Sequence, residues 1–304
     1  MTGARITVGM LTYRRPEGLA RSLPRILAQV REIPGAELLV VDNDTVPSAR
    51  DVVAEHADEP LRYVHEPEPG IVAGRNRALD EAPGDILVFI DDDEIPAPRW
   101  LQTMLDAHDR FGGAGIVGPV LAEYEAPPDP WIAAGRFFER RRYETGTRMP
   151  AAGTGNLLLD LRVVRALGLR FDPAFRESGG SDSAFTRELV RRGGALTWCD
   201  EAPIVDIVPA SRATRSWVSR RAFRVGNAEA RIGVRLASSA ADQLATRSRF
   251  FVKGAARVCG GATRTLMGAI TRDAAHHARG TRTVMRGAGM VAGAIGGVYL
   301  EYRR

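Results

Sequence analysis

Residues 85–93 read Asp-Ile-Leu-Val-Phe-Ile-Asp-Asp-Asp, an almost continuous apolar run that ends in three carboxylates. A run of this length and composition is typical of a strand that is buried on both faces. Adjacent carboxylates repel one another when they are buried, and a divalent cation relieves that repulsion. Asp91, Asp92 and Asp93 therefore indicate either a site for Mg²⁺ or Mn²⁺ or, as the alternative, an exposed acidic turn.

Further strands surround this one along the chain. Runs of apolar and β-branched residues occur at 6–11, 37–41, 61–64 and 195–198. Apolar residues at helical spacing lie between them, most clearly over residues 15–30. Strands that alternate with helices predict an α/β fold, in which a mainly parallel sheet is covered by helices on both faces.

Polar side chains follow three of the predicted strands. Thr12 and Tyr13 follow the first strand, Asp42 follows the second, and Asp91 ends the fourth. Parallel strands end at the same edge of a sheet, and α/β proteins bind their ligands at that edge. We therefore expect these residues to meet at one ligand site, although Asp42 alone also suits an ordinary turn.

Two helix starts carry charged residues that suit a ligand site. Gly74 and Arg75 open a short helix, where backbone N–H groups and a guanidinium fork suit phosphate oxygens. Asp182 follows a pair of glycines and is either a general base toward a hydroxyl or an ordinary helix N-cap. The sequence contains neither the Gly-Lys-Ser/Thr ending of a P-loop nor a Gly-x-Gly-x-x-Gly turn.

Charge divides the chain into two parts. Residues 1–206 contain 24 Lys and Arg against 33 Asp and Glu, and residues 207–304 contain 18 against 4, so the parts carry −9 and +14 and sum to the net +5. We expect basic helices beyond about residue 211 that either contact anionic lipid or form a helical appendage or dimer contact. The 14 uncharged residues at 287–300 suit a packed helix or an interfacial segment.

The sequence also predicts where the protein works. The apolar run at residues 6–11 is too short for a signal peptide, and no run reaches 18 apolar residues. Two cysteines provide no disulfide framework. These features predict a cytoplasmic protein, whose basic tail has the inner face of the membrane as a surface to rest on.

Seven short motifs, taken together and in order, resemble the family 2 glycosyltransferases of the GT-A type over about residues 5–225. They are VGMLTYRRP at 8–16, VVDN at 40–43, GRNRAL at 74–79, FIDDDEIP at 89–96, GTGN at 153–156, RFDPAF at 170–175 and GGSD at 179–182. The pattern around Trp217 is similar to that of bacterial members that build exopolysaccharide or decorate secondary metabolites. The resemblance implies a GT-A type domain over residues 1–225 and a basic helical extension over residues 226–304.

The resemblance assigns donor contacts to five residues. Thr12, Tyr13 and Asp42 match positions that contact the nucleotide base and ribose. Arg75 matches a contact to the diphosphate, and Asn156 lies where the family lines the pocket for the donor sugar and acceptor. UDP is the nucleotide that the family uses most often, so a UDP-sugar is the expected donor.

The resemblance also assigns the metal and the catalytic base. Asp91 and Asp93 match the Asp-x-Asp motif, with Asp93 the foremost ligand of Mn²⁺ or Mg²⁺ and Asp92 near the ribose. Asp182 matches the catalytic base. Two positions depart from the family pattern. A serine precedes Asp182 in place of the common glutamate, and Asp206 stands where the family often has histidine, so that Asp206 becomes a candidate metal ligand.

The implied activity is an inverting transfer of a sugar from a nucleoside diphosphate to a hydroxyl of a glycan, a lipid-linked or a small-molecule acceptor. The loop at 123–149 is expected to contact the acceptor, with Trp131 stacked on a sugar face. Two rivals stay open: a non-catalytic nucleotide- or glycan-binding relative, and a nucleotidyltransferase, whose usual Gly-rich basic loop is missing here. The arginine-rich tail contains no recognised nucleic-acid motif, so no nucleic-acid partner is expected.

Overall fold

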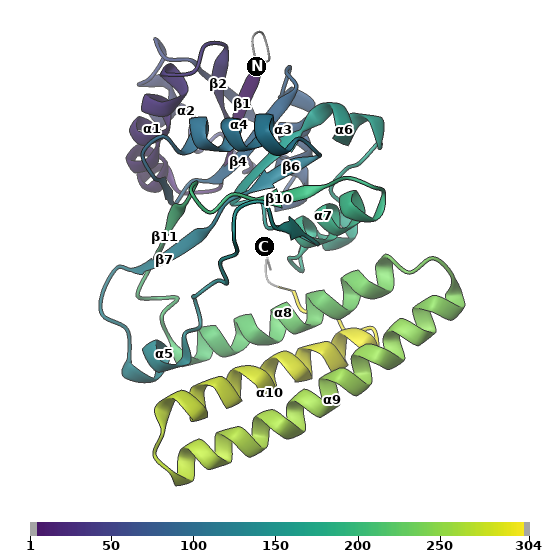
Figure 1. Cartoon of the computed structure of the whole chain (residues 1–304). Helices are drawn as coiled ribbons and strands as arrows, with labels where there is room; N and C mark the ends of the chain where they lie inside the picture. Colours follow the sequence, from purple (N-terminus) through teal and green to yellow (C-terminus); the bar gives the residue numbers. More distant parts are fainter. Residues whose placement is uncertain (1–4, 301–304) are drawn as a thin grey trace. The chain divides into compact units, whose positions relative to one another are not determined.

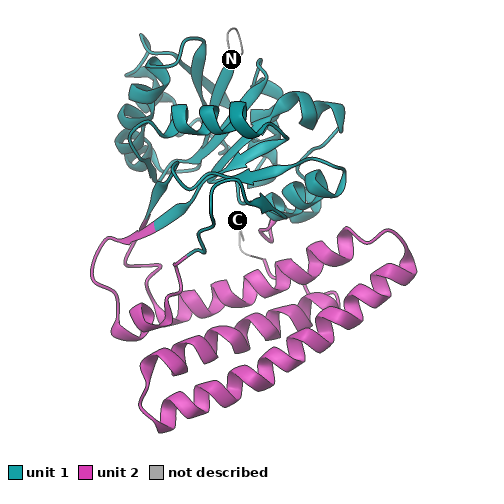
Figure 2. Cartoon of the chain, viewed as in Figure 1, with its two compact units in different colours: residues 1–121, 140–176, 181–206 teal, residues 122–139, 177–180, 207–304 magenta. Residues whose placement is uncertain are grey.

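The computed structural model describes residues 5–300, and these residues form two compact units. Unit 1 consists of residues 1–121, 140–176 and 181–206, and unit 2 of residues 122–139, 177–180 and 207–304 (Figure 2). The chain therefore passes between the units several times. The expected boundary at residues 225–226 falls inside helix α8, Arg215–Arg235, which belongs to unit 2 as a whole.

Unit 1 is built around an eight-stranded sheet with the order β3-β2-β1-β4-β9-β6-β10-β8. The strands are β1 (Ile6–Thr12), β2 (Ala36–Asp42), β3 (Leu61–His65), β4 (Ile86–Asp91), β6 (Gly115–Val117), β8 (Arg148–Met149), β9 (Asn156–Asp160) and β10 (Leu196–Trp198). Strands β1 to β4 are parallel, as are β6 and β10. Strand β9 runs antiparallel between β4 and β6, and β8 runs antiparallel to β10.

Helices cover both faces of this sheet (Figure 1). Successive side chains of a strand point to opposite faces. Accordingly, Ile86, Val88 and Ile90 of β4 pack in one apolar cluster, and Leu87 and Phe89 pack in the other. The first cluster includes residues of α1 (Pro16–Arg31), α2 (Arg50–Ala54) and α4 (Trp100–Phe111), and the second includes residues of α3 (Ile71–Glu81), α6 (Leu161–Ala166) and α7 (Ser181–Arg191). The predicted α/β architecture is confirmed.

A second, three-stranded sheet has the order β5-β11-β7. Its strands are β5 (Glu94–Pro96), β7 (Val120–Tyr124) and β11 (Ile204–Val208). Strand β5 follows directly on the acidic end of β4, and it pairs antiparallel with β11 so that Glu94 lies opposite Asp206. This small sheet therefore places Glu94 and Asp206 side by side, close in sequence to Asp91.

Unit 2 is mainly helical, with three long helices and the short helix α5, Pro130–Gly135. Helix α10 (Ala274–Ala294) packs against both α8 and α9 (Ala240–Ile270). Glycine makes this packing close, because a Cβ atom at Gly289 would lie 1.9 Å from the carbonyl oxygen of Phe223. Gly287 and Met290 are buried, so the uncharged segment forms a packed helix as far as Ala294. Within residues 5–300, no helix combines the length and apolar character needed to cross a bilayer.

Candidate active site

The carboxyl ends of β1, β2 and β4 bring the predicted residues together. Parallel register places Thr12 opposite Asp42 on β2, and it places Leu11 opposite Asp91 on β4. The Thr12 hydroxyl donates a hydrogen bond to Asp92 at 2.8 Å, across 80 residues of sequence. The expected convergence of strand-end polar groups is therefore present in the structure.

Arg15 binds the acidic triplet. Its Nη1 atom lies 2.7 Å from Asp93 Oδ2 and 3.3 Å from Asp92 Oδ1. Burial raises the pKa of the Asp92 carboxyl, and the hydrogen bond from Thr12 and the charge of Arg15 oppose that rise. Arg15 lies within the first sequence motif, but its own role was not predicted. The guanidinium supplies one of the positive charges that this crowded set of carboxylates requires.

Glu94 is a further carboxylate of the site that sequence reasoning missed. It is buried, and its Oε2 atom accepts a hydrogen bond of 2.9 Å from the backbone N–H of Asp91. Burial and the charge of Asp91 raise the pKa of Glu94 well above its ordinary value. Desolvation raises the pKa of Asp91 to about 6, opposed by the charge of Arg75. The run of four acids before Ile95 was the available signal for this residue.

The chemistry of these side chains fits a divalent metal. Among the described residues, no three His, Cys, Asp or Glu side chains form a ready-made metal cluster. Mg²⁺, however, is commonly held by one or two carboxylates together with substrate phosphates. Asp91 and Asp93 provide such hard oxygen donors in a place where carboxylates repel one another. Asp206 forms an ion pair with Arg140 at 3.1 Å, so its predicted metal role competes with that contact.

Arg75 and Asp182 lie beside the acidic cluster. The Arg75 guanidinium donates a hydrogen bond of 2.6 Å to the Ser181 hydroxyl, and its charge acts on Asp91. Asp182 is the second residue of α7, so it lies inside the first turn and is not the capping residue. Its Oδ2 atom lies 3.4 Å from where a Cβ atom of Gly153 would be, and its charge also raises the pKa of Asp91. The serine that departs from the family pattern therefore contacts the predicted diphosphate-binding arginine.

Asp42 is buried and anchors its own loop. Its carboxylate accepts hydrogen bonds from Ser48 Oγ, Ala49 N and Tyr63 Oη, at 2.7 to 3.2 Å. Burial, followed by this bond, raises the pKa of Tyr63. Tyr13 is half-buried and carries the Arg14 guanidinium over its ring at 5.1 Å. Tyr13 therefore retains an accessible edge for a ligand, whereas Asp42 shapes the loop beside it.

Asn156 is buried and uses both ends of its amide. Its Oδ1 atom accepts a bond from Trp100 Nε1 at 2.9 Å, and its Nδ2 atom donates to the carbonyl oxygens of Pro119 and Ala202 at 2.9 and 2.8 Å. The side chain therefore joins β9 to α4 and to two loops. Within the described structure, these contacts leave its amide no spare donor for a sugar.

We expect Asn156→Ala to lower the free energy of unfolding by roughly 2–5 kcal/mol, because one buried donor and two buried carbonyls lose their partner. Chemical denaturation followed by circular dichroism measures this change. Gln102→Ala, which removes an exposed amide bonded to Asp106, serves as the control and leaves stability nearly unchanged. Equal stability of Asn156→Ala and the wild type would contradict the structural role.

Trp131 lies in unit 2 and is 7% exposed. Its Nε1 atom donates a 2.8 Å hydrogen bond to His277 Nδ1, and its ring contacts Phe137 at 5.1 Å between centroids. The guanidinium of Arg215 lies 5.1 Å from the same ring. The structure does not support stacking of Trp131 on a sugar, because these neighbours enclose the ring. The apolar residues around 131–138 instead explain why this loop belongs to the core of the helical unit.

Comparison with known proteins relates this site to a family. Residues 7–167 match the model described as Glycosyl transferase family 2. The chain is 35% identical over 231 residues to the succinoglycan biosynthesis protein ExoM of Rhizobium meliloti (strain 1021), which covers 75% of this chain and 74% of that protein. The mannosyltransferase PcManGT from Pyrobaculum calidifontis, solved with GDP-Man and Mn²⁺, is 19% identical with a TM-score of 0.62 over 95% of this chain and 87% of its own. TarS 1–349 of S. aureus, solved with UDP-GlcNAc, is 14% identical with a TM-score of 0.54 over 92% and 91%. The two structures show a likeness of fold.

Proposed function

The chain belongs to glycosyltransferase family 2, and from this premise we propose that it transfers a sugar from a nucleoside diphosphate sugar to an acceptor hydroxyl, with inversion at the anomeric carbon. One observation carries the proposal. Asp91, Asp93, Arg75 and Asp182 act electrostatically on one another at the carboxyl end of β4. Such a group provides hard oxygen ligands, a cation for phosphate and a carboxylate base within one site.

The donor is proposed to bind along the ends of β1 and β4. Arg75 contacts the diphosphate, since a guanidinium fork matches phosphate oxygens. Thr12 and Tyr13 lie beside the base and ribose with Asp92, while Asp42 and Asn156 hold the surrounding loops in place. A UDP-sugar is the proposed donor, and the neighbour solved with GDP-Man makes GDP-sugars the first comparison.

Catalysis is proposed to depend on Asp182. Its carboxylate takes the proton of the acceptor hydroxyl while that oxygen forms a bond to the anomeric carbon. The bond from the anomeric carbon to the diphosphate oxygen breaks at the same time, and the nucleoside diphosphate leaves with the electron pair. Arg75 stabilises the charge on the leaving diphosphate. A divalent metal held by Asp93 and Asp91 would neutralise part of the same charge.

Nucleotide release from a donor panel tests the proposal. Purified full-length protein is incubated with UDP-, GDP- and dTDP-sugars in Mn²⁺, Mg²⁺ or EDTA, and free nucleoside diphosphate is measured. We expect slow hydrolysis of one UDP-sugar that requires metal, since water replaces the absent acceptor. If the protein neither releases nor binds any nucleotide in the presence of metal, the non-catalytic alternative is favoured by the departures at Ser181 and Asp206.

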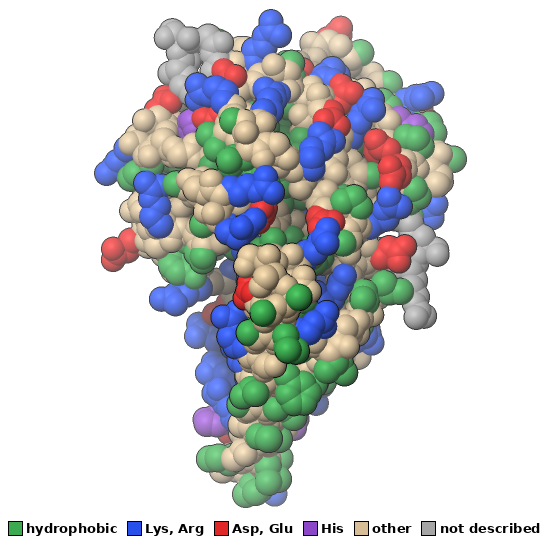
Figure 3. Space-filling model, turned by 90° about the vertical axis from the view of Figure 1, so that its right-hand side faces the viewer, with side chains coloured by type: hydrophobic (Ala, Val, Ile, Leu, Met, Phe, Trp, Pro, Cys, Tyr) green, Lys and Arg blue, Asp and Glu red, His purple; other side chains and the backbone are tan. Residues whose placement is uncertain are grey.

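We further propose that the acceptor is polymeric or lipid-linked and that α9 rests on anionic membrane. The large apolar side chains of one face of α9 are solvent-exposed, and they are Leu244, Phe251, Val252, Leu266, Met267 and Ile270. At 100° per residue, Arg257 and Lys253 lie on the opposite side of this helix. Hydrophobic side chains and Lys or Arg gather over the helical unit in Figure 3. An apolar face bordered by cations suits the interface of an anionic bilayer.

Val252→Ser together with Leu266→Ser is expected to weaken binding to vesicles by at least about tenfold, since each large side chain contributes roughly 1.5–3 kcal/mol when buried. Flotation with phosphatidylglycerol vesicles measures this partition. The control is Val46→Ser, which changes an equally exposed apolar residue of unit 1. Equal flotation of the double variant and the wild type would remove the membrane proposal.

A further inference from the structure

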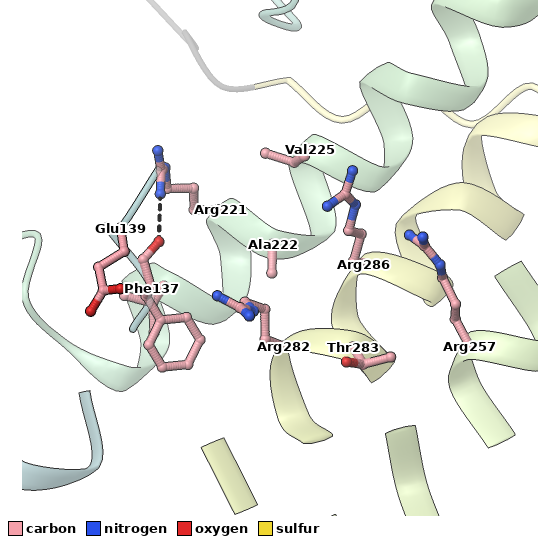
Figure 4. A pocket seen from close by; sticks show the side chains of 10 residues that line it. Phe137, Glu139, Arg221, Ala222, Val225, Arg257, Arg282, Thr283 and Arg286 are labelled. Carbon is pink, nitrogen blue, oxygen red and sulfur yellow. Dashed lines mark hydrogen bonds between the residues drawn. The ribbon is translucent and has the colours of Figure 1, made fainter. Parts of the chain in front are cut away.

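A pocket of about 480 Å³ lies inside the helical unit, away from every residue discussed above as part of the donor site. Helix α8 contributes Arg221 to its wall, α9 contributes Arg257, and α10 contributes Arg282 and Arg286 (Figure 4). Glu139 provides the carboxylate of the lining. Four guanidinium groups and one carboxylate give the lining a net charge of +3.

Little negative charge compensates these arginines. Arg286 pairs with Glu229 at 2.7 Å, and Glu229 is shared with Lys253. Among the described residues, neither Arg257 nor Arg282 forms an ion pair. Arg257 contacts the Met290 sulfur at 3.7 Å, and Arg282 donates to the carbonyl oxygen of Arg136 at 3.1 Å.

The arginines also repel one another. Burial lowers the pKa of Arg282, and the charges of Arg279, Arg286 and Arg264 lower it further, while Glu139 opposes them. Within residues 5–300, the buried Nε atom of Arg286 has no hydrogen-bond partner. Arginine nevertheless stays protonated in proteins. A group of cations held together in this way is relieved by an anion that accepts from several guanidinium groups.

We propose that this pocket binds a phosphate-bearing anion of two or more negative charges, with a diphosphate as the best match. The net charge of +3 on the lining balances a diphosphate, and guanidinium forks suit its oxygens. Phe137 and Val225 lie on the same lining and provide apolar surface for a carbon group next to the phosphate. The ligand is therefore either a soluble phosphate compound or the phosphate head of a lipid. This site does not depend on the proposed transferase activity.

Isothermal titration with inorganic pyrophosphate tests the proposal on the full-length protein. The buffer contains EDTA, so that a metal-dependent donor site does not contribute. We expect wild-type protein to bind, and Arg257→Gln and Arg282→Gln each to weaken binding roughly tenfold or more, because each removes a charge-assisted hydrogen bond. Arg249→Gln is the matched control, because Arg249 is an exposed arginine of the same helix as Arg257.

Three further measurements separate this reading from others. Thermal unfolding without ligand shows whether Arg257→Gln is folded, and we expect no loss of stability, since its contact to Met290 is weak. Arg75→Ala should keep pyrophosphate binding, because Arg75 belongs to unit 1. Farnesyl diphosphate and vesicles with phosphatidic acid identify the source: tighter binding than pyrophosphate indicates a lipid, and equal or weaker binding indicates a soluble compound. No binding of pyrophosphate by the wild type, or an equal loss in Arg249→Gln, overturns the proposal.

Discussion

Replacing Asp182 by Asn is expected to lower the rate of sugar transfer by about 10²–10⁴-fold, with the affinity for the donor little changed. An amide of the same shape cannot take a proton from the acceptor hydroxyl. It keeps an oxygen that can accept the 2.7 Å hydrogen bond from the backbone N–H of Ser183, so the start of α7 is preserved. Single-turnover transfer with the donor found in the panel measures the rate.

The control for this variant is Asp51→Asn. Asp51 also lies in the first turn of a helix of unit 1, at the start of α2, and it is exposed. We expect that control to transfer sugar at the wild-type rate. Full activity in Asp182→Asn would show that another group removes the proton, and Asp91 would be the next carboxylate to examine because desolvation raises its pKa to about 6.

Asp93→Ala is expected to abolish metal-dependent release of nucleotide, with a loss of at least about 10²-fold, because a metal at a leaving group contributes several kcal/mol. The same change should leave the metal-free protein as stable as the wild type or more so. Asp93 raises the pKa of Asp91 by repulsion, and its removal relieves part of that repulsion. Unimpaired stability together with lost activity distinguishes a ligand from a structural residue.

Donor hydrolysis against Mn²⁺ concentration, combined with thermal unfolding in EDTA, measures both effects. Asp106→Ala is the control, since Asp106 is an exposed aspartate of α4 whose side chain is bonded to Gln102. If Asp93→Ala retained the metal response of the wild type, the metal would have to be held by other carboxylates, and Asp91 with Glu94 would replace the proposed pair.

Hydrophobic patterning was sufficient to predict the frame of unit 1. The run from Ile86 to Ile90 is too apolar for anything but a strand with two covered faces, and the structure buries all of it. Parallel strands share one carboxyl edge, so the meeting of Thr12, Asp42 and Asp91 also follows from local pattern. These features depend on backbone geometry, which short stretches of sequence specify.

Contacts between distant side chains needed the folded chain. Arg15 reaches Asp93 across 78 residues, and Glu94 turns inward because β5 pairs with β11. Asn156 and Trp131 carry residue types that suit sugar binding, yet both are used within the protein, because packing chose their partners. Residue type states what a side chain can bind and leaves open what lies beside it.

The arginine pocket shows the same division most clearly. Sequence alone established that residues 207–304 carry +14, and such charge is usually spread over solvated helix faces. Only the packing of α10 against α8 and α9 places Arg221, Arg257 and Arg286 around one space. Periodicity assigns each arginine to a face of its own helix. The rotation and depth at which three helices meet depend on close contacts such as that of Gly289 with the backbone of Phe223, and these contacts are set by the tertiary structure.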